Sequence, residues 1–203
     1  MEMDMRVKTD AKRAAIIAVA TDLFREVGYE RASMAEIATR VGGSKATLYN
    51  YFPSKEELFA VAMMDAMEER GEELSALLDS SHDDVRQVLT SFGMAYLPFI
   101  TAPDALAMMR TAVAEGANSE LGRDMYRRGP KRGWLIVADY LARLQQRGVL
   151  DNTDPAVMGA HLKALFEAGT LEPRLFGAEP EFSVDQAVSC AVSAFLRVYS
   201  ARE

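Results

Sequence analysis

The sequence predicts an all-α fold, in which an N-terminal three-helix domain with a helix-turn-helix is joined by a shared helix to a larger helical domain. Apolar residues recur at helical spacing through most of the 203 residues, and no run alternates as a convincing strand does. Residues 31–59 contain three short helical segments with two tight joints between them. These observations place a small domain in residues 1–59 and a larger one in residues 60–203.

The first helix is expected to begin near Asp10 and to end at Gly28. Glycine ends helices readily because it adopts the left-handed backbone conformation without strain. The apolar positions recur on one face of this helix and can cover the two helices that follow. These positions are Ile16, Ala20, Leu23, Phe24 and Val27.

A capping box opens the next helix. Ser33 and Glu36 are three residues apart, so each side chain can satisfy a backbone donor at the start of a helix over about residues 34–41. Two glycines at 42–43 supply the backbone freedom for a sharp turn. The inward-facing residues expected in this domain are Ile37, Ala38, Val41, Leu48 and Phe52.

The second helix of the pair is expected over residues 45–50, capped by Ser44 and ended by Pro53. Ser54 and Glu57 repeat the capping box, so a third helix should start directly after Ser54. Two short helices joined by a tight turn are typical of a helix-turn-helix that reads DNA. We therefore expect this domain to bind DNA.

One helix should connect the two domains, because the apolar residues 58–64 run into the acidic segment EERGEEL without a break. Further helices are expected on the apolar positions of residues 85–99 and 106–113. A longer helical region over residues 119–147 contains a Gly-Pro pair at 129–130. Proline lacks an amide hydrogen and its ring clashes with the preceding turn, so a kink or a restart is expected there.

The last two helices are clearly delimited. An Asp-Pro pair introduces a helix over residues 156–168, and Ser183 with Gln186 forms a third capping box before a helix over residues 184–200. The final helix carries a broad stripe of alanine and valine. Such a stripe fits either an internal core or a subunit interface, and we expect these two helices to form a homodimer across a two-fold axis.

The net charge of −7 is unevenly distributed along the chain. Residues 1–59 hold nine Lys/Arg and nine Asp/Glu, so the remaining 144 residues hold 14 and 21 and carry the whole excess. Basic residues around the first helix and the reading helix are available for phosphate contacts, although ordinary solvated charges give the same composition. These residues are Arg6, Lys8, Lys12, Arg13, Lys45 and Lys55.

Other protein classes are disfavoured by the composition. A single cysteine, Cys190, excludes an internal disulfide framework, and its Ala/Val-rich surroundings predict a buried residue instead of a redox sensor. No stretch approaches the roughly 18 uncharged residues of a membrane span, so a soluble, cytoplasmic protein is expected. His82 and His161 lack the spacing of a metal site or of a nucleophile and base, so we expect no metal, cofactor or catalysis.

Three segments of the N-terminal domain occur in a familiar order within a region of resemblance over residues 10–60: LFREVGYERAS, MAEIATRVGGSKATLYNYF and SKEELF, which lie within residues 23–59. They resemble the TetR/AcrR family of transcriptional regulators. The second domain, in AEGANSELGRDMYRRGPKRGWLIVADYLARLQQRGVL and EPRLFG, resembles the AefR-like class of C-terminal regions. The resemblance implies about nine helices and a homodimer that places two reading helices in successive major grooves of a palindromic operator. Gly43 and Asn50 depart from the residues more usual in the family.

The family pattern also implies roles for single residues of the helix-turn-helix. Lys45 could reach guanine, and Thr47 a thymine methyl group. Taken singly, Thr47 and Asn50 would be read as solvated helix residues, whereas Tyr51 fits core packing and DNA contact equally well. The implied base-edge residues are Lys45, Ala46, Thr47 and Asn50, with Ala35 close by, and the implied phosphate contacts are Ser33, Tyr49 and Lys55.

The second domain is the candidate sensor of a small apolar or aromatic effector. It is rich in aromatic side chains and adaptable methionines, with a few polar groups among them. Plain core packing is the simpler explanation for each residue taken alone. Glu115 and Glu167 fit a cationic ligand, a solvated face or a salt bridge. The candidate ligand-binding residues are Phe92, Tyr96, Phe99, Met109, Trp134, His161 and Phe166.

Two functions follow from these features. The first is a DNA-binding regulator, with repression as the family's usual mode, in which an effector moves the shared helix and changes the spacing of the reading heads. The alternative is a helical dimer that binds a protein partner without binding DNA. The intact set of Lys45, Thr47, Tyr49 and Lys55 favours the regulator.

Overall fold

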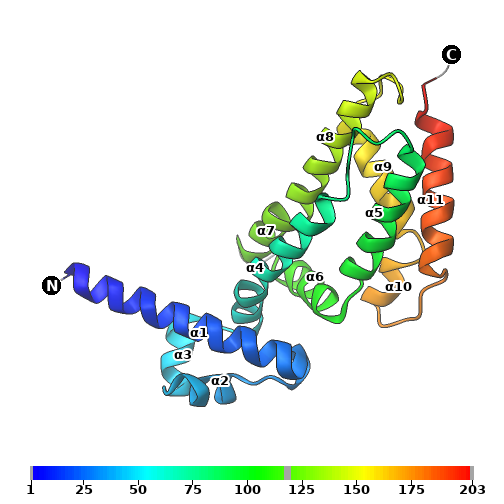
Figure 1. The fold of residues 1–203 in the computed structure, drawn as a ribbon. Helices are drawn as coiled ribbons and strands as arrows, with labels where there is room; N and C mark the ends of the chain where they lie inside the picture. The colour runs from blue at the N-terminus through cyan, green and yellow to red at the C-terminus, as the bar shows by residue number, and fades with distance from the viewer. Residues whose placement is uncertain (1, 117–119, 202–203) are drawn as a thin grey trace. The chain divides into compact units, whose positions relative to one another are not determined.

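The computed structural model describes the backbone of residues 2–116 and 120–201, and the side chains of these residues except those of 2–9, 65 and 115. The all-α fold class is confirmed: the described residues form eleven α-helices and one π-helical segment, without a strand (Figure 1). A single antiparallel bridge pairs Leu150 with Ser200. The helices in excess of the nine expected are short ones, such as α7 (Glu120–Tyr126) and α10 (Leu171–Leu175).

The chain forms two compact units, each built from separate stretches of sequence. Helices α4 (Lys55–Ser75) and α6 (Pro103–Gly116) contribute residues to both units. The domain boundary that we expected after residue 59 lies inside α4, and the two units divide along this helix between Ala66 and Met67. The first unit consists of Met1–Ala66 and Ala107–Met125, and the second of Met67–Leu106 and Tyr126–Glu203.

The first unit contains the predicted helix-turn-helix. Its helices α1 (Glu2–Arg31), α2 (Met34–Val41) and α3 (Lys45–Tyr51) pack with the first part of α4 around one apolar core. Val27 and Val41, expected inside this core, pack against it and are only partly buried. Its most deeply buried large side chains are Ile16, Leu23, Ile37, Phe52, Leu58 and Phe59.

The predicted serine caps are present at the starts of α2 and α3, although Glu36 does not return the bond that a full capping box requires. Ser33 accepts a hydrogen bond from the backbone of Glu36 at 3.2 Å, and Ser44 accepts one from the backbone of Thr47 at 3.0 Å. Gly42 has φ 69°, which produces the left-handed turn between α2 and α3. The expected start of α1 near Asp10 was wrong, because the helix begins at Glu2. The residues that precede the apolar stripe contain no sequence pattern that predicts the additional turns of the helix.

The Gly28 stop is confirmed in part. Gly28 has φ 79° and leaves the helical path there, yet helical structure resumes as far as Arg31. The backbone amide of Ala32 then donates to the Gly28 carbonyl at 3.2 Å. The result is a sharp bend that brings Tyr29 back toward the start of α4.

The second unit is built around four long helices. Helix α9 (Pro155–Glu167) contacts α5 (Val85–Ile100), α8 (Arg132–Gln146) and α11 (Val184–Tyr199), as Figure 1 shows. The caps predicted for α9 and α11 are confirmed. Asp154 accepts a hydrogen bond from the backbone of Ala156, and Ser183 forms a full capping box with Gln186. Large buried side chains of this unit include Leu89, Leu97, Leu141, Leu144, Phe166 and Phe195.

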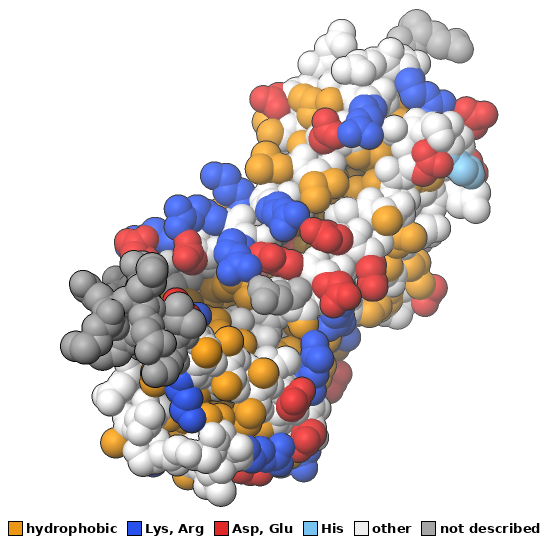
Figure 2. All heavy atoms as spheres, turned by 60° about the vertical axis from the view of Figure 1, so that its left-hand side comes forward, with side chains coloured by type: hydrophobic (Ala, Val, Ile, Leu, Met, Phe, Trp, Pro, Cys, Tyr) orange, Lys and Arg blue, Asp and Glu red, His pale blue; other side chains and the backbone are white. Residues whose placement is uncertain are grey.

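The interruption expected at the Gly-Pro pair is confirmed and takes a specific form. Residues Arg127–Lys131 form a π-helical turn that contains Pro130, between α7 and α8. Proline cannot donate the bond that an α-helix needs at that position, and a wider turn accommodates its ring. Arg128 and Arg132 then pair with Glu68 and Glu72 of α4, at 2.8 and 3.0 Å. Such exposed pairs add little stability. Figure 2 shows one face of the molecule, on which Lys and Arg side chains lie beside Asp and Glu side chains.

The prediction that Cys190 is buried was wrong. Its side chain is exposed on α11, whereas Val188, Ala191 and Val192 are buried. The apolar composition of the segment was read correctly, but the helical register turns position 190 outward.

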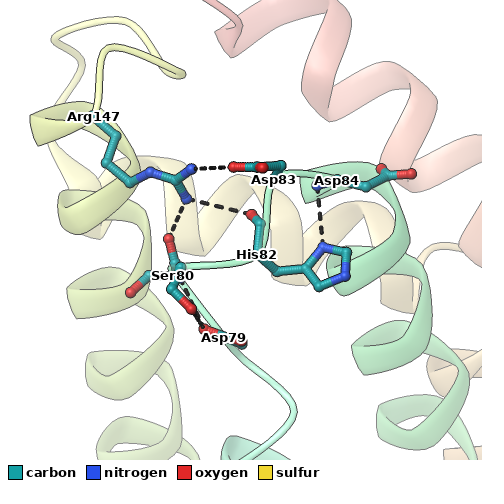
Figure 3. A network of polar contacts seen from close by, with 7 residues as sticks. Asp79, Ser80, His82, Asp83, Asp84 and Arg147 are labelled. Atoms are coloured by element: carbon teal, nitrogen blue, oxygen red, sulfur yellow. Dashed lines mark hydrogen bonds and ion pairs between the residues drawn. The ribbon is translucent and has the colours of Figure 1, made fainter.

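Arg147, directly after α8, holds the loop between α4 and α5 (Figure 3). Its guanidinium donates to the backbone carbonyls of Ser80 and His82, and it pairs with the Asp83 carboxylate at 3.0 Å. We call this group the Arg147 anchor. It fixes a loop, residues 76–84, in which every side chain is partly or fully exposed. Among the described helices, none is long and apolar enough to cross a membrane.

Candidate nucleic-acid interface

Helix α3 presents most of the predicted base-reading residues on one surface. Lys45, Ala46, Tyr49 and Asn50 are exposed, while Leu48 is buried in the core of the first unit. The Lys45 ammonium lies 5.9 Å from the centre of the Tyr49 ring, so these two side chains are neighbours. A helix anchored in this way presents these exposed side chains to a partner.

Thr47 is partly buried, and its hydroxyl already has a partner. Its Oγ1 atom lies 2.8 Å from the hydroxyl of Ser44, which also caps the helix. The hydroxyl pair therefore belongs to the turn, and the methyl group is the part of Thr47 left for an apolar contact. This placement is compatible with the expected contact to a thymine methyl group, which stays a prediction.

Helix α2 supports α3 and carries Ala35 and Ser33 at its exposed start. The hydroxyl of Ser33 is engaged by the helix cap. Instead of completing the capping box, the Glu36 carboxylate pairs with Arg40 at 3.0 Å. Arg40 also contacts Glu26 of α1 at 2.8 Å, and this hydrogen bond raises the pKa of Arg40.

The start of α4 contains Lys55, the third predicted phosphate contact. Its ammonium lies 4.2 Å from the centre of the Tyr29 ring, and the Tyr29 hydroxyl donates to the Glu56 carboxylate at 2.6 Å. The hydrogen bond from Tyr29 lowers the pKa of Glu56, while burial and then Glu56 raise the pKa of Tyr29. Sequence reasoning missed Tyr29. An aromatic residue directly after the helix-ending Gly28 was the available signal.

Two residues of the predicted basic cluster, Lys12 and Arg13, lie in α1 and make contacts within the first unit. Lys12 donates to the Val41 carbonyl at 3.3 Å, and the Arg13 guanidinium lies 5.0 Å from the centre of the Phe52 ring. The side chains of Arg6 and Lys8 lie outside the described residues. Tyr51 is partly buried and packs against the apolar core, which agrees with the core interpretation.

Four predicted ligand-binding residues of the second unit form one aromatic cluster. Phe92 and Tyr96 are stacked, with ring centres 5.7 Å apart, and Trp134 lies edge-on to Tyr96 at 5.4 Å. Phe166 completes the group at 6.1 Å from Tyr96. Tyr96 donates to Glu167 at 2.5 Å, and Lys163 also pairs with this carboxylate. Burial, followed by the Glu167 charge, raises the pKa of Tyr96 well above its ordinary value.

The other three candidates lie elsewhere. Phe99 faces a groove of about 300 Å³ together with Arg70, Leu74, Leu77 and Ala95. His161 is exposed and forms a hydrogen bond with Tyr199. Met109 belongs to the first unit, and the Glu115 side chain lies outside the described residues. The seven candidates therefore do not line one cavity within the described part of the second unit.

Comparisons with known proteins agree with this architecture. Residues 16–62 match the family of bacterial regulatory proteins called the tetR family, and residues 87–201 match the AefR-like transcriptional repressor C-terminal domain. The transcriptional activator FasR of Mycolicibacterium smegmatis is 33% identical over 95 residues, which cover 47% of this chain and 43% of that protein. The match thus spans less than half the length of this curated relative.

Solved structures extend the similarity to nearly the whole chain. A putative TetR-family regulator from Mesorhizobium loti is 26% identical, with a TM-score of 0.77, and the match covers 95% of this chain and 98% of the other. The flavonoid-responsive regulator FrrA is 27% identical, with a TM-score of 0.65 and coverage of 96% and 100%. With the capped helix-turn-helix and the helical second unit, these matches show that the chain belongs to the TetR family and is a DNA-binding transcriptional regulator with an AefR-like C-terminal domain.

Proposed function

We propose that this protein is a cytoplasmic repressor that binds a palindromic operator as a homodimer and leaves it when a small apolar or aromatic effector binds. The observation that carries the proposal is the surface of α3, where Lys45, Ala46, Tyr49 and Asn50 are exposed around the buried Leu48. A helix of this kind can enter the major groove and present side chains to base edges.

The residues divide into two roles. Lys45, Ala46, Thr47 and Asn50, with Ala35 beside them, read base edges. Ser33, Tyr49 and Lys55 contact phosphates and fix the register of the helix on the duplex. The exposure of Tyr49 and the caps that hold both helices support this division.

Dimerisation through α9 and α11 is supported by their exposed surfaces. Val157 of α9 and Val198 of α11 are 43% and 57% exposed, and Ala160 and Ala164 are exposed on α9. Small and β-branched residues permit the close approach of helices from two subunits. A two-fold axis through this surface places two reading helices on the two halves of a palindrome.

The effector site is proposed at the aromatic cluster of Phe92, Tyr96, Trp134 and Phe166. Its rings offer apolar surface, while Tyr96 and Glu167 add polar groups for orientation. The similarity to FrrA, which is described as responsive to flavonoids, supports an aromatic effector. The effector acts by binding one arrangement of α4 better than the other, since only differential affinity can shift the equilibrium.

Selection of bound fragments from genomic DNA, repeated at rising salt, tests this function. We expect one enriched palindrome, with affinity that falls steeply as salt rises. Lys45→Ala and Tyr49→Ala should each weaken operator binding at least about tenfold, because each change acts in both reading heads. Helix content and dimerisation should stay unchanged.

Lys131→Ala is the matched control, because it removes an exposed lysine of the second unit. It should bind the operator as the parent does. Enrichment of no sequence by a folded dimer would favour the partner-binding alternative. Normal operator binding by both α3 variants would show that the assigned reading surface is wrong.

A further inference from the structure

We propose that Tyr29 is a positioning residue for DNA binding, which holds the Lys55 ammonium ready for a phosphate and keeps the Glu56 carboxylate engaged. The inference rests on the proposed phosphate contact of Lys55. It adds a residue of α1, directly after the bend at Gly28, to the residues that prepare the interface, without a contact between Tyr29 and DNA.

The Tyr29 ring is a fixed platform. It lies 4.7 Å from the Phe59 ring and 6.3 Å from the Phe24 ring, both of which are buried in the core of the first unit. The Lys55 ammonium lies 4.2 Å from the ring centre, within the range of a cation–π contact. A flexible lysine therefore has a defined place before DNA arrives, which reduces the conformational entropy lost on binding.

The contact with the ring also leaves hydrogen-bond donors available. An ammonium group has three donors, and a π face does not use them as a carboxylate does. Lys55 has one backbone contact, to the Glu30 carbonyl at 3.4 Å, which is longer than a usual hydrogen bond. Lys55 is thus held in place while most of its donors can still reach a phosphate.

Glu56 is the group that would oppose this arrangement. It follows Lys55 directly, and a carboxylate without another partner there would pair with the ammonium and occupy its donors. The Tyr29 hydroxyl donates to it at 2.6 Å, so part of its hydrogen-bonding capacity is satisfied on the side of the bend. One side chain therefore acts on two neighbouring residues of opposite charge.

A double-mutant cycle tests the proposal with the selected operator and with a random-sequence duplex. Lys55→Ala should lower the slope of log affinity against log salt by about two, one phosphate for each reading head. Tyr29→Leu should weaken binding about fivefold, because Lys55 loses its platform in both heads. In the Lys55→Ala protein, the same Tyr29 change should cost less than about twofold.

Two conservative changes separate positioning from packing. Tyr29→Phe keeps the ring and should lose only about twofold, because only the Glu56 bond is removed. Lys55→Arg can stack on the ring and bind phosphate, so it should retain parental affinity only while the ring is present. Thermal unfolding of each variant establishes that the measurements are made on folded protein.

The outcomes distinguish this inference from the proposed function. An equal loss from Tyr29→Leu with and without Lys55 would overturn positioning and leave a packing role. An unchanged salt slope in Lys55→Ala would overturn the phosphate contact. A parent that prefers no operator, yet shows the Lys55-dependent slope and the coupling on the random duplex, would refute the operator proposal while supporting the positioning by Tyr29.

Discussion

The start of α4 carries one cation, Lys55, and the loop that follows the end of α4 contacts another, Arg147. The two cations are held in different ways. Lys55 lies over the Tyr29 ring in the first unit and makes a single long backbone contact. Arg147 in the second unit uses its guanidinium on two backbone carbonyls and on Asp83. A cation that binds another molecule needs hydrogen-bond donors that the protein leaves available, whereas a structural cation donates its hydrogen bonds within the protein.

The difference extends to the kind of partner. Tyr29 is partly buried and packs against core rings, so the contact with Lys55 depends on the packing of the first unit. The Arg147 anchor depends on the conformation of residues 79–84, where Asp79 also accepts hydrogen bonds from Ser81 (Figure 3). We therefore expect variants at Lys55 to change DNA binding and variants at Arg147 to change stability.

Arg147→Ala should have the largest effect on stability. Removing the charged donor leaves two loop carbonyls to water and should cost about 1 kcal/mol of the free energy of unfolding, or roughly 2–4 °C in Tm. Urea and thermal unfolding measure this loss. Operator affinity of the folded variant should equal that of the parent.

Arg143→Ala is the matched control, because Arg143 lies one turn earlier on α8 and only pairs with the exposed Asp139. Its unfolding should not differ measurably from that of the parent. A loss of stability as large as that of Arg147→Ala would mean that the anchor contributes no more than an ordinary surface pair.

Tyr29→Phe should have a smaller, pH-dependent effect on stability. The Tyr29 hydrogen bond is the largest cause of the lowered pKa of Glu56. A group with a lowered pKa in the folded state stabilises the protein above its ordinary value, here 4.5, and this contribution is lost as the pH falls through the folded pKa. Urea unfolding at pH 7 and at stepwise lower pH should show a flatter acid dependence for Tyr29→Phe.

The parallel change Tyr51→Phe provides the comparison, since Tyr51 packs against the same core. Its acid dependence should follow the parent. If Tyr29→Phe also follows the parent, the hydrogen bond does not hold Glu56 ionised more strongly in the folded state.

Asp83→Asn should have the smallest effect. The Asp83 side chain is 99% exposed, so its attraction to Arg147 is screened by water and salt. The carbonyl bonds of Arg147 remain in the variant, and no measurable change in unfolding is expected. A loss comparable to that of Arg147→Ala would assign the anchor to charge pairing instead of to the carbonyls.

Local signals in the sequence predicted much of the fold. Ser33, Ser44 and the glycine at 42 define helix ends through bonds to residues a few positions away, and the structure contains these bonds. The Gly-Pro pair at 129–130 likewise marked the interruption before α8. Such features are legible because the interacting groups are close in sequence.

The contacts between distant residues could not be read in the same way. Tyr29 and Glu56 are 27 positions apart, and Arg147 reaches a carbonyl 67 positions away. The sequence predicted a helix end at Gly28, but it did not show which distant residue Tyr29 meets beyond that bend, nor how α8 packs. The error at Cys190 has a related cause, because an apolar neighbourhood does not give the register of the buried face.

Gly93 of α5 lets Phe166 of the aromatic cluster pack directly against the backbone of α5. A methyl group at this position would lie 2.6 Å from the Phe166 ring and 3.0 Å from Val188 of α11, so three helices meet there without spare volume. We therefore expect a ring-sized molecule that binds beside Gly93 to displace Phe166, and the densely packed neighbours to move with it. Binding at the proposed effector site would then shift α9 and α11, the helices proposed to face the second subunit, and a thicker ligand would shift them further.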